Sequence, residues 1–158
     1  MPDWRFNYRS RNVPVLDLVV QAEGHPAIQL TGIVDSGATH TMLSIETAEA
    51  LGLRRTDLIK SPPATIADDT KVPSWTTEVA IRAQVQARLP DEGPPEPWGP
   101  IFDLYPRFMK SGSPLLGQED FCASFKVNLE RFLLPAYFVL EYWAGMSEGS
   151  PRAGGTGT

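Results

Sequence analysis

The hydrophobic positions of this chain fall into short runs separated by turn-forming residues. Residues 13–20 (VPVLDLVV) and 28–34 (IQLTGIV) are rich in β-branched side chains, which predicts a pair of neighbouring strands. Residues 76–85 alternate between apolar and polar positions, and together with residues 64–66 they flank a polar turn at 68–71. This second pattern predicts a hairpin with a polar tip.

One stretch has helical rather than strand-like spacing. Ile45, Ala48 and Leu51 lie three residues apart and would share one face of a helix. Ser44 can cap the start of this helix and Gly52 can end it. The spacing therefore predicts a short amphipathic helix over 44–51.

Prolines interrupt the second half of the chain. Residues 89–100 (LPDEGPPEPWGP) hold five prolines and two glycines, which predicts a surface loop and argues against a helix or a central strand. A strand limited by Pro106 is predicted over 101–109, and acidic residues at 118–120 suit the start of a second helix. Two further runs, at 126–130 and 132–142, predict a closing strand pair.

Many short strands with only one or two short helices favour an all-β barrel or sandwich. A chain of 158 residues is long enough for one domain with its own core. We expect a single domain over 1–143. Residues 144–158 hold too few apolar side chains to pack, so we expect them to form a disordered tail.

The composition narrows the class of partner and the compartment. The net charge is −5, and nucleic-acid binding needs a clustered basic face, so we expect no nucleic-acid partner. Cys122 is the only cysteine, which excludes an intramolecular disulfide and fits a reducing, cytoplasmic compartment. The longest apolar run, 132–140, is interrupted by Pro135, so we expect no signal peptide, membrane span or membrane partner.

The apolar run at 28–34 leads into Asp35, Ser36 and Gly37. A lone carboxylate is costly to bury, but a second carboxylate that shares a proton with it lowers the cost. Such a pair can remove a proton from water while its protonated member polarises a peptide carbonyl. Asp35 is therefore a candidate for peptide hydrolysis that needs no metal and no cofactor. The Ser36 hydroxyl could hold the loop, and Gly37 allows close backbone approach.

Four segments follow one another in a definite order. They are Asp35-Ser36-Gly37-Ala38 after the apolar run, the helix at 44–51 followed by Gly52-Leu53, the hairpin ATIADDTKVPSW, and Pro114-Leu115-Leu116-Gly117. In this combination they resemble the retropepsin-like aspartic proteases, in particular the single-domain bacterial relatives of retroviral proteases. The resemblance covers about 13–142. It implies an acid-protease barrel with a flap at about 64–80 that closes over substrate.

The resemblance also implies residue roles. It makes Asp35 the catalytic residue, with Ser36 and Gly37 as support for its loop. The implied substrate contacts are Ala38, Thr39, His40, Ala67, Asp68, Asp69 and Trp75. The implied core behind the active site is Leu115, Leu116 and Gly117. No metal site and no cofactor are implied.

The chain carries this motif once. None of its other aspartates is followed by Ser or Thr and then Gly, so a second carboxylate must come from elsewhere. Single-domain members of the family obtain the pair from a two-fold homodimer, and such an interface brings the same residue of both chains to the axis. We therefore expect Asp35 and its symmetry mate to form the pair, in a homodimer that acts on a peptide or protein substrate.

Some positions depart from the retroviral pattern and leave alternatives open. Thr39 and Gln118 stand where the family usually has an acid and an arginine, so we expect a neutral hydrogen bond between them. The tip at 68–71 has no glycine, so a dimeric peptide-binding or assembly module that does not cleave is a second hypothesis. A monomer without a carboxylate pair is a third. Ser36 lacks the Gly-x-Ser-x-Gly elbow of a serine nucleophile.

Overall fold

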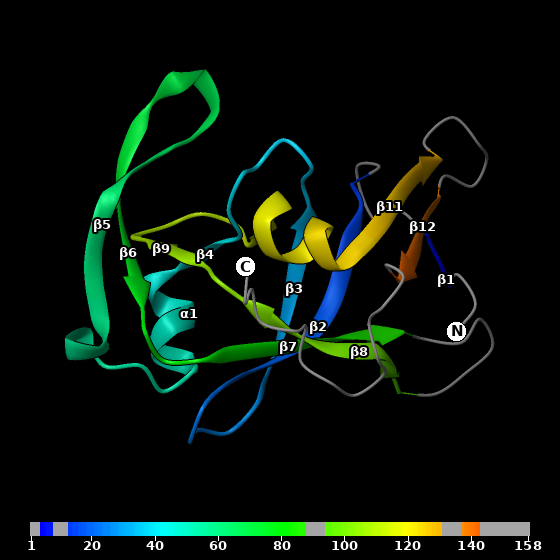
Figure 1. The fold of residues 1–158 in the computed structure, drawn as a ribbon, viewed down its shortest axis with the longest axis horizontal. Coiled ribbons are helices and arrows are strands. Elements are labelled where there is room, and N and C mark those ends of the chain that lie inside the picture. Colours follow the sequence, from blue (N-terminus) through cyan, green and yellow to red (C-terminus); the bar gives the residue numbers. More distant parts are fainter. Residues whose placement is uncertain (1–3, 8–12, 88–93, 131–136, 143–158) are drawn as a thin grey trace, which may run out of the picture.

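The computed structural model describes residues 4–7, 13–87, 94–130 and 137–142 (Figure 1). Its strands are β1 (Trp4–Asn7), β2 (Val15–Ala22), β3 (Ile28–Val34), β4 (Met42–Ser44), β5 (Leu58–Thr65), β6 (Lys71–Thr77), β7 (Ile81–Ala87), β8 (Glu96–Leu104), β9 (Arg107–Met109), β10 (Leu115–Leu116), β11 (Phe125–Glu130) and β12 (Tyr137–Tyr142). Its helical segments are α1 (Ile45–Ala50) and the short turns η2 (Arg55–Asp57), η3 (Ala67–Asp69) and η4 (Gln118–Cys122). Within these residues no helix is long and apolar enough to cross a membrane.

The strands form two sheets. Nine of them pair in the order β5-β6-β9-β4-β10-β3-β2-β7-β8, and the other three pair in the order β1-β12-β11. The β5–β6 hairpin and the three-stranded sheet lie at opposite ends of the molecule (Figure 1). Between them, β10 runs parallel to β3 and antiparallel to β4, so the middle of the large sheet joins segments that are distant in sequence.

The core lies where the inward faces of the strands meet the helical turn η4. In β2 the buried positions alternate, and Leu16, Leu18 and Val20 are at most 1% exposed. Phe121 belongs to η4 and Phe125 to β11, and the centroids of their rings lie 5.2 Å apart. This aromatic contact joins the small sheet to the large one.

The predicted strand pair and first helix are both confirmed. β2 and β3 pair antiparallel, with Leu18 opposite Leu30. The Ser44 side chain accepts a 3.0 Å hydrogen bond from the Thr47 N–H and so caps α1. Gly52 follows the helix with φ +90°, a conformation that L side chains rarely adopt.

The predicted hairpin exists with different bounds. β5 and β6 run over Leu58–Thr65 and Lys71–Thr77, so the hairpin begins before residue 64 and ends before residue 80. The alternating run at 76–85 is not one strand: residues 78–80 turn the chain from β6 into β7. Val79 continues the alternation through this turn, and hydrophobic periodicity alone therefore cannot detect the break.

The proline-rich prediction at 89–100 is wrong for its second half. β8 begins at Glu96 and includes Pro97 and Pro100. The strand lies at the edge of the nine-stranded sheet. Proline has no backbone N–H to donate, and on the open side of an edge strand no neighbouring strand needs that hydrogen bond. The strand predicted at 101–109 is divided by Tyr105 and Pro106 into the end of β8 and the separate β9.

The closing strand pair is confirmed as β11 and β12, which pair antiparallel. β1 adds to β12 on its other side, and neither β1 nor the short strands β4 and β10 are anticipated from sequence. Residues 89–93 of the proline-rich loop, the start of the predicted strand at 132–136 and the tail at 144–158 lie outside the described residues.

Candidate active site

Asp35 follows β3 in a tight turn. Its N–H donates to the Leu116 carbonyl at 3.0 Å, and its own carbonyl accepts from the Ala38 N–H at 3.1 Å. One carboxylate oxygen, Oδ1, accepts a 2.9 Å hydrogen bond from the Gly37 N–H. The other oxygen, Oδ2, has no hydrogen-bond partner in the described part of the chain. A Cβ on Gly37 would lie 3.2 Å from Oδ1, so glycine here keeps the carboxylate uncrowded.

The turn is tied to the segment after β10. The Gln118 amide donates to the Ser36 carbonyl, and the Gln118 N–H donates to the Ala38 carbonyl at 2.8 Å. The Glu119 N–H donates to the Thr39 carbonyl at 3.0 Å. The expected side-chain bond between Thr39 and Gln118 is thus replaced by bonds to backbone carbonyls. The Ser36 hydroxyl, expected to hold the loop, has no hydrogen bond within the described residues.

Leu115, Leu116 and Gly117 run beside this turn. Leu115 and Leu116 pair in parallel with Ile33 and Val34 of β3. A Cβ on Gly117 would lie 2.4 Å from the carbonyl carbon of His40, closer than real contacts allow. Glycine is therefore required at Gly117 because two backbone segments cross there.

We call the turn at 35–41 and the segment at 115–121 that holds it the floor of the site. Asp120 in this floor is a second carboxylate, and it is only 1% exposed. It accepts hydrogen bonds from the Thr41 hydroxyl at 2.5 Å, the Tyr105 N–H at 3.0 Å and the Phe121 N–H at 2.7 Å. Thr41 Oγ1 in turn accepts from the Gly117 N–H at 3.1 Å. Three segments, those of Thr41, Tyr105 and Gly117–Phe121, are thus joined through one buried carboxylate, which the sequence predicted only as a residue that suits a helix start.

The Asp35 carboxylate opens into a groove of about 590 Å³ between the floor and the β5–β6 hairpin. Asp35 is the only carboxylate among the groove's described lining residues. These residues are Asp35, Gly37, Ala38, Thr39, His40, Met42, Pro62, Pro63, Ala64, Thr65, Ile66, Arg107, Met109 and Leu115. A groove of this size fits the range of ligand-binding clefts.

The structure brings some of the expected substrate contacts together and leaves others apart. Ala38, Thr39 and His40 line the groove, and His40 Nδ1 lies 3.0 Å from a Glu119 carboxylate oxygen. The hairpin tip Ala67–Asp69 is the turn η3, and its described side chains, Asp68 and Asp69, do not line the groove. Trp75 also lies elsewhere, in a separate pocket beside α1.

Several groove residues escape sequence reasoning. Pro62 and Pro63 lie outside the predicted hairpin, and the bulged pairing of β5 with β6 gives no periodic signal there. Together with residues 64–66 of the predicted hairpin they form the roof. On β9 the side chains alternate: Phe108 is fully buried, whereas Arg107 and Met109 line the groove. A strand of three residues is too short for its alternation to be read from the sequence.

The chemistry available at this floor is that of a carboxylate beside apolar walls. Within the described ranges, no three His, Cys, Asp or Glu side chains lie close enough together to hold a metal ion. The half-buried thiol of Cys122 has a raised pKa, first because of desolvation by burial and then because of the negative charges of Asp120 and Asp35. A thiol with a raised pKa is a weak nucleophile at neutral pH.

No protein-family model and no curated protein matches this sequence. Among solved structures, the chain is similar to a retropepsin-like aspartic protease from Rickettsia conorii, with a TM-score of 0.53 and 15% identity over 89% of this chain and 91% of that one. It is also similar to the EIAV protease complexed with the inhibitor HBY-793, with a TM-score of 0.48 and 11% identity over 72% of this chain and 89% of that one. The mostly β architecture with its short helices, described above, agrees with the first of these matches. The chain therefore has the single-domain fold of the retropepsin-like aspartic proteases.

Proposed function

We propose that this protein is an aspartic endopeptidase that acts as a homodimer, with Asp35 of each copy contributing to one catalytic pair. The observation that carries the proposal is the position of the Asp35 carboxylate. It lies at the floor of a groove, with one oxygen bound to the Gly37 N–H and the other without a partner in the described residues. The fold similarity supports the same reading without establishing activity.

The pair would work by sharing one proton. Two carboxylates about 3 Å apart cannot both ionise, so one stays protonated. The ionised member takes a proton from a water molecule, and the water oxygen attacks the peptide carbonyl carbon. The protonated member donates a hydrogen bond to the carbonyl oxygen as negative charge develops there. Because each chain offers one such motif, cleavage needs two chains.

The groove favours an extended peptide. An extended strand between floor and hairpin can make main-chain hydrogen bonds, and its alternate side chains can enter pockets. Met42 and Met109 are at most 8% exposed and form an apolar wall of the groove. Methionine side chains adapt to different apolar shapes. We therefore expect apolar substrate side chains at this wall.

Arg107 adds a charge preference to that wall. Its N–H donates to the Thr41 carbonyl at 2.8 Å, and its guanidinium makes no ion pair in the described part of the chain. A guanidinium binds a carboxylate through two parallel hydrogen bonds. Peptides with an acidic side chain next to an apolar one should be cleaved about ten-fold faster than their amide counterparts. Arg107→Glu should reverse this preference in favour of Lys or Arg.

The test of the function is cleavage of a peptide library between about pH 3 and pH 7. Asp35→Asn should lower kcat/KM by about 10³-fold or more while leaving the thermal unfolding transition in place. Asp103→Asn is the matched control, because Asp103 lies outside the groove and pairs with Arg82. Activity per chain should rise with protein concentration until the dimer saturates, in step with sedimentation measurements.

Three outcomes would overturn the proposal. If wild type and Asp35→Asn cleave equally well, the carboxylate has no catalytic role. If a dimer binds library peptides but cleaves none across this pH range, the protein is a dimeric binding or assembly module. A protein that stays monomeric at high concentration would remove the two-chain mechanism.

A further inference from the structure

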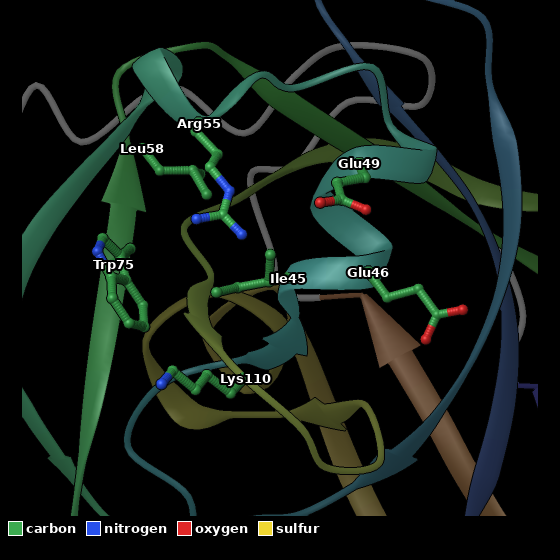
Figure 2. A pocket seen from close by; sticks show the side chains of 7 residues that line it. All are labelled: Ile45, Glu46, Glu49, Arg55, Leu58, Trp75 and Lys110. Carbon is green, nitrogen blue, oxygen red and sulfur yellow. The ribbon is translucent and has the colours of Figure 1, made fainter.

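A second pocket lies beside α1 at the base of the β5–β6 hairpin (Figure 2). We call it the helix–hairpin pocket. It has a volume of about 370 Å³ and is lined by Ile45, Glu46, Glu49, Arg55, Leu58, Trp75 and Lys110. None of these described residues lines the groove that holds Asp35. The helix–hairpin pocket is therefore a separate candidate site of a size that ligands use.

The apolar walls of this pocket come from three different elements. Ile45 begins α1, Leu58 begins β5, and Trp75 lies on β6. All three side chains are half-buried. In Figure 2 the Trp75 ring and the Ile45 side chain stand on opposite sides of the pocket. An aromatic or aliphatic body placed between them would remove apolar surface from water on both of its faces.

Two cations border the same space. Arg55 extends into the pocket from η2 and Lys110 reaches it from the other end (Figure 2). In the described part of the chain neither side chain makes an ion pair. The neighbouring Arg54 makes one with Asp57, at 3.5 Å, and so leaves Arg55 without that partner. The two ends of the apolar slot therefore each present a positive charge that no ion pair in the described part of the chain neutralises.

The acidic residues of the lining, Glu46 and Glu49, form no ion pair with these two cations. The Glu46 carboxylate points away from the other labelled side chains, and Glu49 approaches Arg55 from the helix without forming an ion pair (Figure 2). A cationic ligand placed between Trp75 and Ile45 would meet Arg55 and Lys110 before it met either carboxylate. A neutral ligand would leave both cations partly desolvated and without a partner, which costs free energy.

We propose that the helix–hairpin pocket binds a small carboxylate carried on an apolar or aromatic body. The body lies between Ile45, Leu58 and Trp75. The carboxylate accepts two parallel hydrogen bonds from the Arg55 guanidinium, or a charged hydrogen bond from the Lys110 ammonium. Binding does not depend on the proposed proteolysis, because no residue of this pocket lines the groove.

Occupation would also act on the hairpin. The ligand would touch α1 and both strands of the hairpin at once, so it would favour the arrangement in which the hairpin base lies close to the helix. Pro62 to Ile66 of the same hairpin form the roof of the groove. This consequence rests on the proposed function: the ligand should change KM for peptides, whereas its binding should be unchanged in Asp35→Asn.

The test compares two probes that differ only in charge, 4-phenylbutyrate and its primary amide, by isothermal titration calorimetry. The carboxylate should bind about ten-fold more tightly than the amide. Combining Arg55→Gln with Lys110→Gln should remove that difference, and Trp75→Leu should weaken both probes. Lys71→Gln is the matched control, because Lys71 is an exposed cation on β6 outside the pocket, and it should change neither affinity.

Other results would overturn the proposal. Equal binding of the two probes, or a ten-fold difference that survives in the double variant, removes the role of the cations. Tighter binding of 4-phenylbutylamine assigns the pocket to Glu46 and Glu49 instead. Failure of wild type to bind either probe at about 10 mM rules out the site. A circular dichroism spectrum like that of wild type shows that each variant is folded, and failure of peptide cleavage alone leaves this test unaffected.

Discussion

Beneath the groove, Thr41 and Asp120 are almost fully buried and join three backbone segments, whereas above it every described side chain of residues 65–71 is exposed. Asp120 alone accepts three hydrogen bonds. The hairpin tip is closed by a 2.9 Å bond from the Ile66 N–H to the Thr70 carbonyl. The floor is thus held by buried contacts, whereas the exposed tip has few contacts to hold it, an arrangement that suits the proposed enclosure of a peptide.

Replacing the Asp120 carboxylate, which accepts the buried hydrogen bonds, should destabilise the floor. Asp120→Asn exchanges one acceptor oxygen for an NH₂ group that faces donors, so it should lower the free energy of unfolding by about 3 kcal/mol and the Tm by about 10 °C. Chemical and thermal denaturation measure both quantities. Asp103→Asn, which removes a partly exposed ion pair at 3.8 Å, should cost less than about 1 kcal/mol. If both variants lose the same free energy of unfolding, the buried Asp120 network contributes no more to stability than the partly exposed ion pair does.

Substitutions in the hairpin tip should cost less stability than substitutions in the floor. Asp68 and Asp69 have φ of 69° and 58°, in the left-handed region that favours glycine. The double change to glycine relieves this strain but loosens the unfolded chain, so the free energy of unfolding should change by less than about 1 kcal/mol. Amide exchange at Ile66 should become faster. A loss as large as that of Asp120→Asn would show that the tip is as constrained as the floor.

The smallest effect concerns the thiol beneath the floor. Burial, then the charges of Asp120 and Asp35, raise the pKa of Cys122, so less thiolate is present at pH 8 and iodoacetamide should react more slowly than with free cysteine. Asp35→Asn removes one of these charges and should raise the rate about two-fold. The pH profile of alkylation measures this directly. A midpoint at or below that of free cysteine would contradict it.

The sequence predicts the parts of this fold that carry a local signal. The β2–β3 pair has two β-rich runs joined by a short turn, and α1 has both its cap, Ser44, and its terminal Gly52. β4, β9 and β10 have only two or three residues each, so no periodicity identifies them. β8 is not predicted because it contains prolines, which argue against a strand in general but are tolerated in an edge strand.

The residues of the candidate site differ in the same way: some carry a local sequence signal and others do not. Asp35 and the loop around it are recognisable because the motif is contiguous. The contact between Thr41 and Asp120 joins residues 79 positions apart, and neither residue signals the other in a single sequence. Arg107 reaches the groove only because β9 lies beside β4, a parallel pairing that no local pattern predicts.

The two-residue strand β10 has a consequence for biosynthesis. Leu115 and Leu116 fill the space between β3 and β4, and the Gln118 amide binds the Ser36 carbonyl across 82 positions of sequence. Contacts this distant form late, because the chain must close a long loop first. A nascent chain that has left the ribosome only as far as residue 100 therefore holds Asp35 without these contacts. The site should not assemble until residues 115–118 have also emerged.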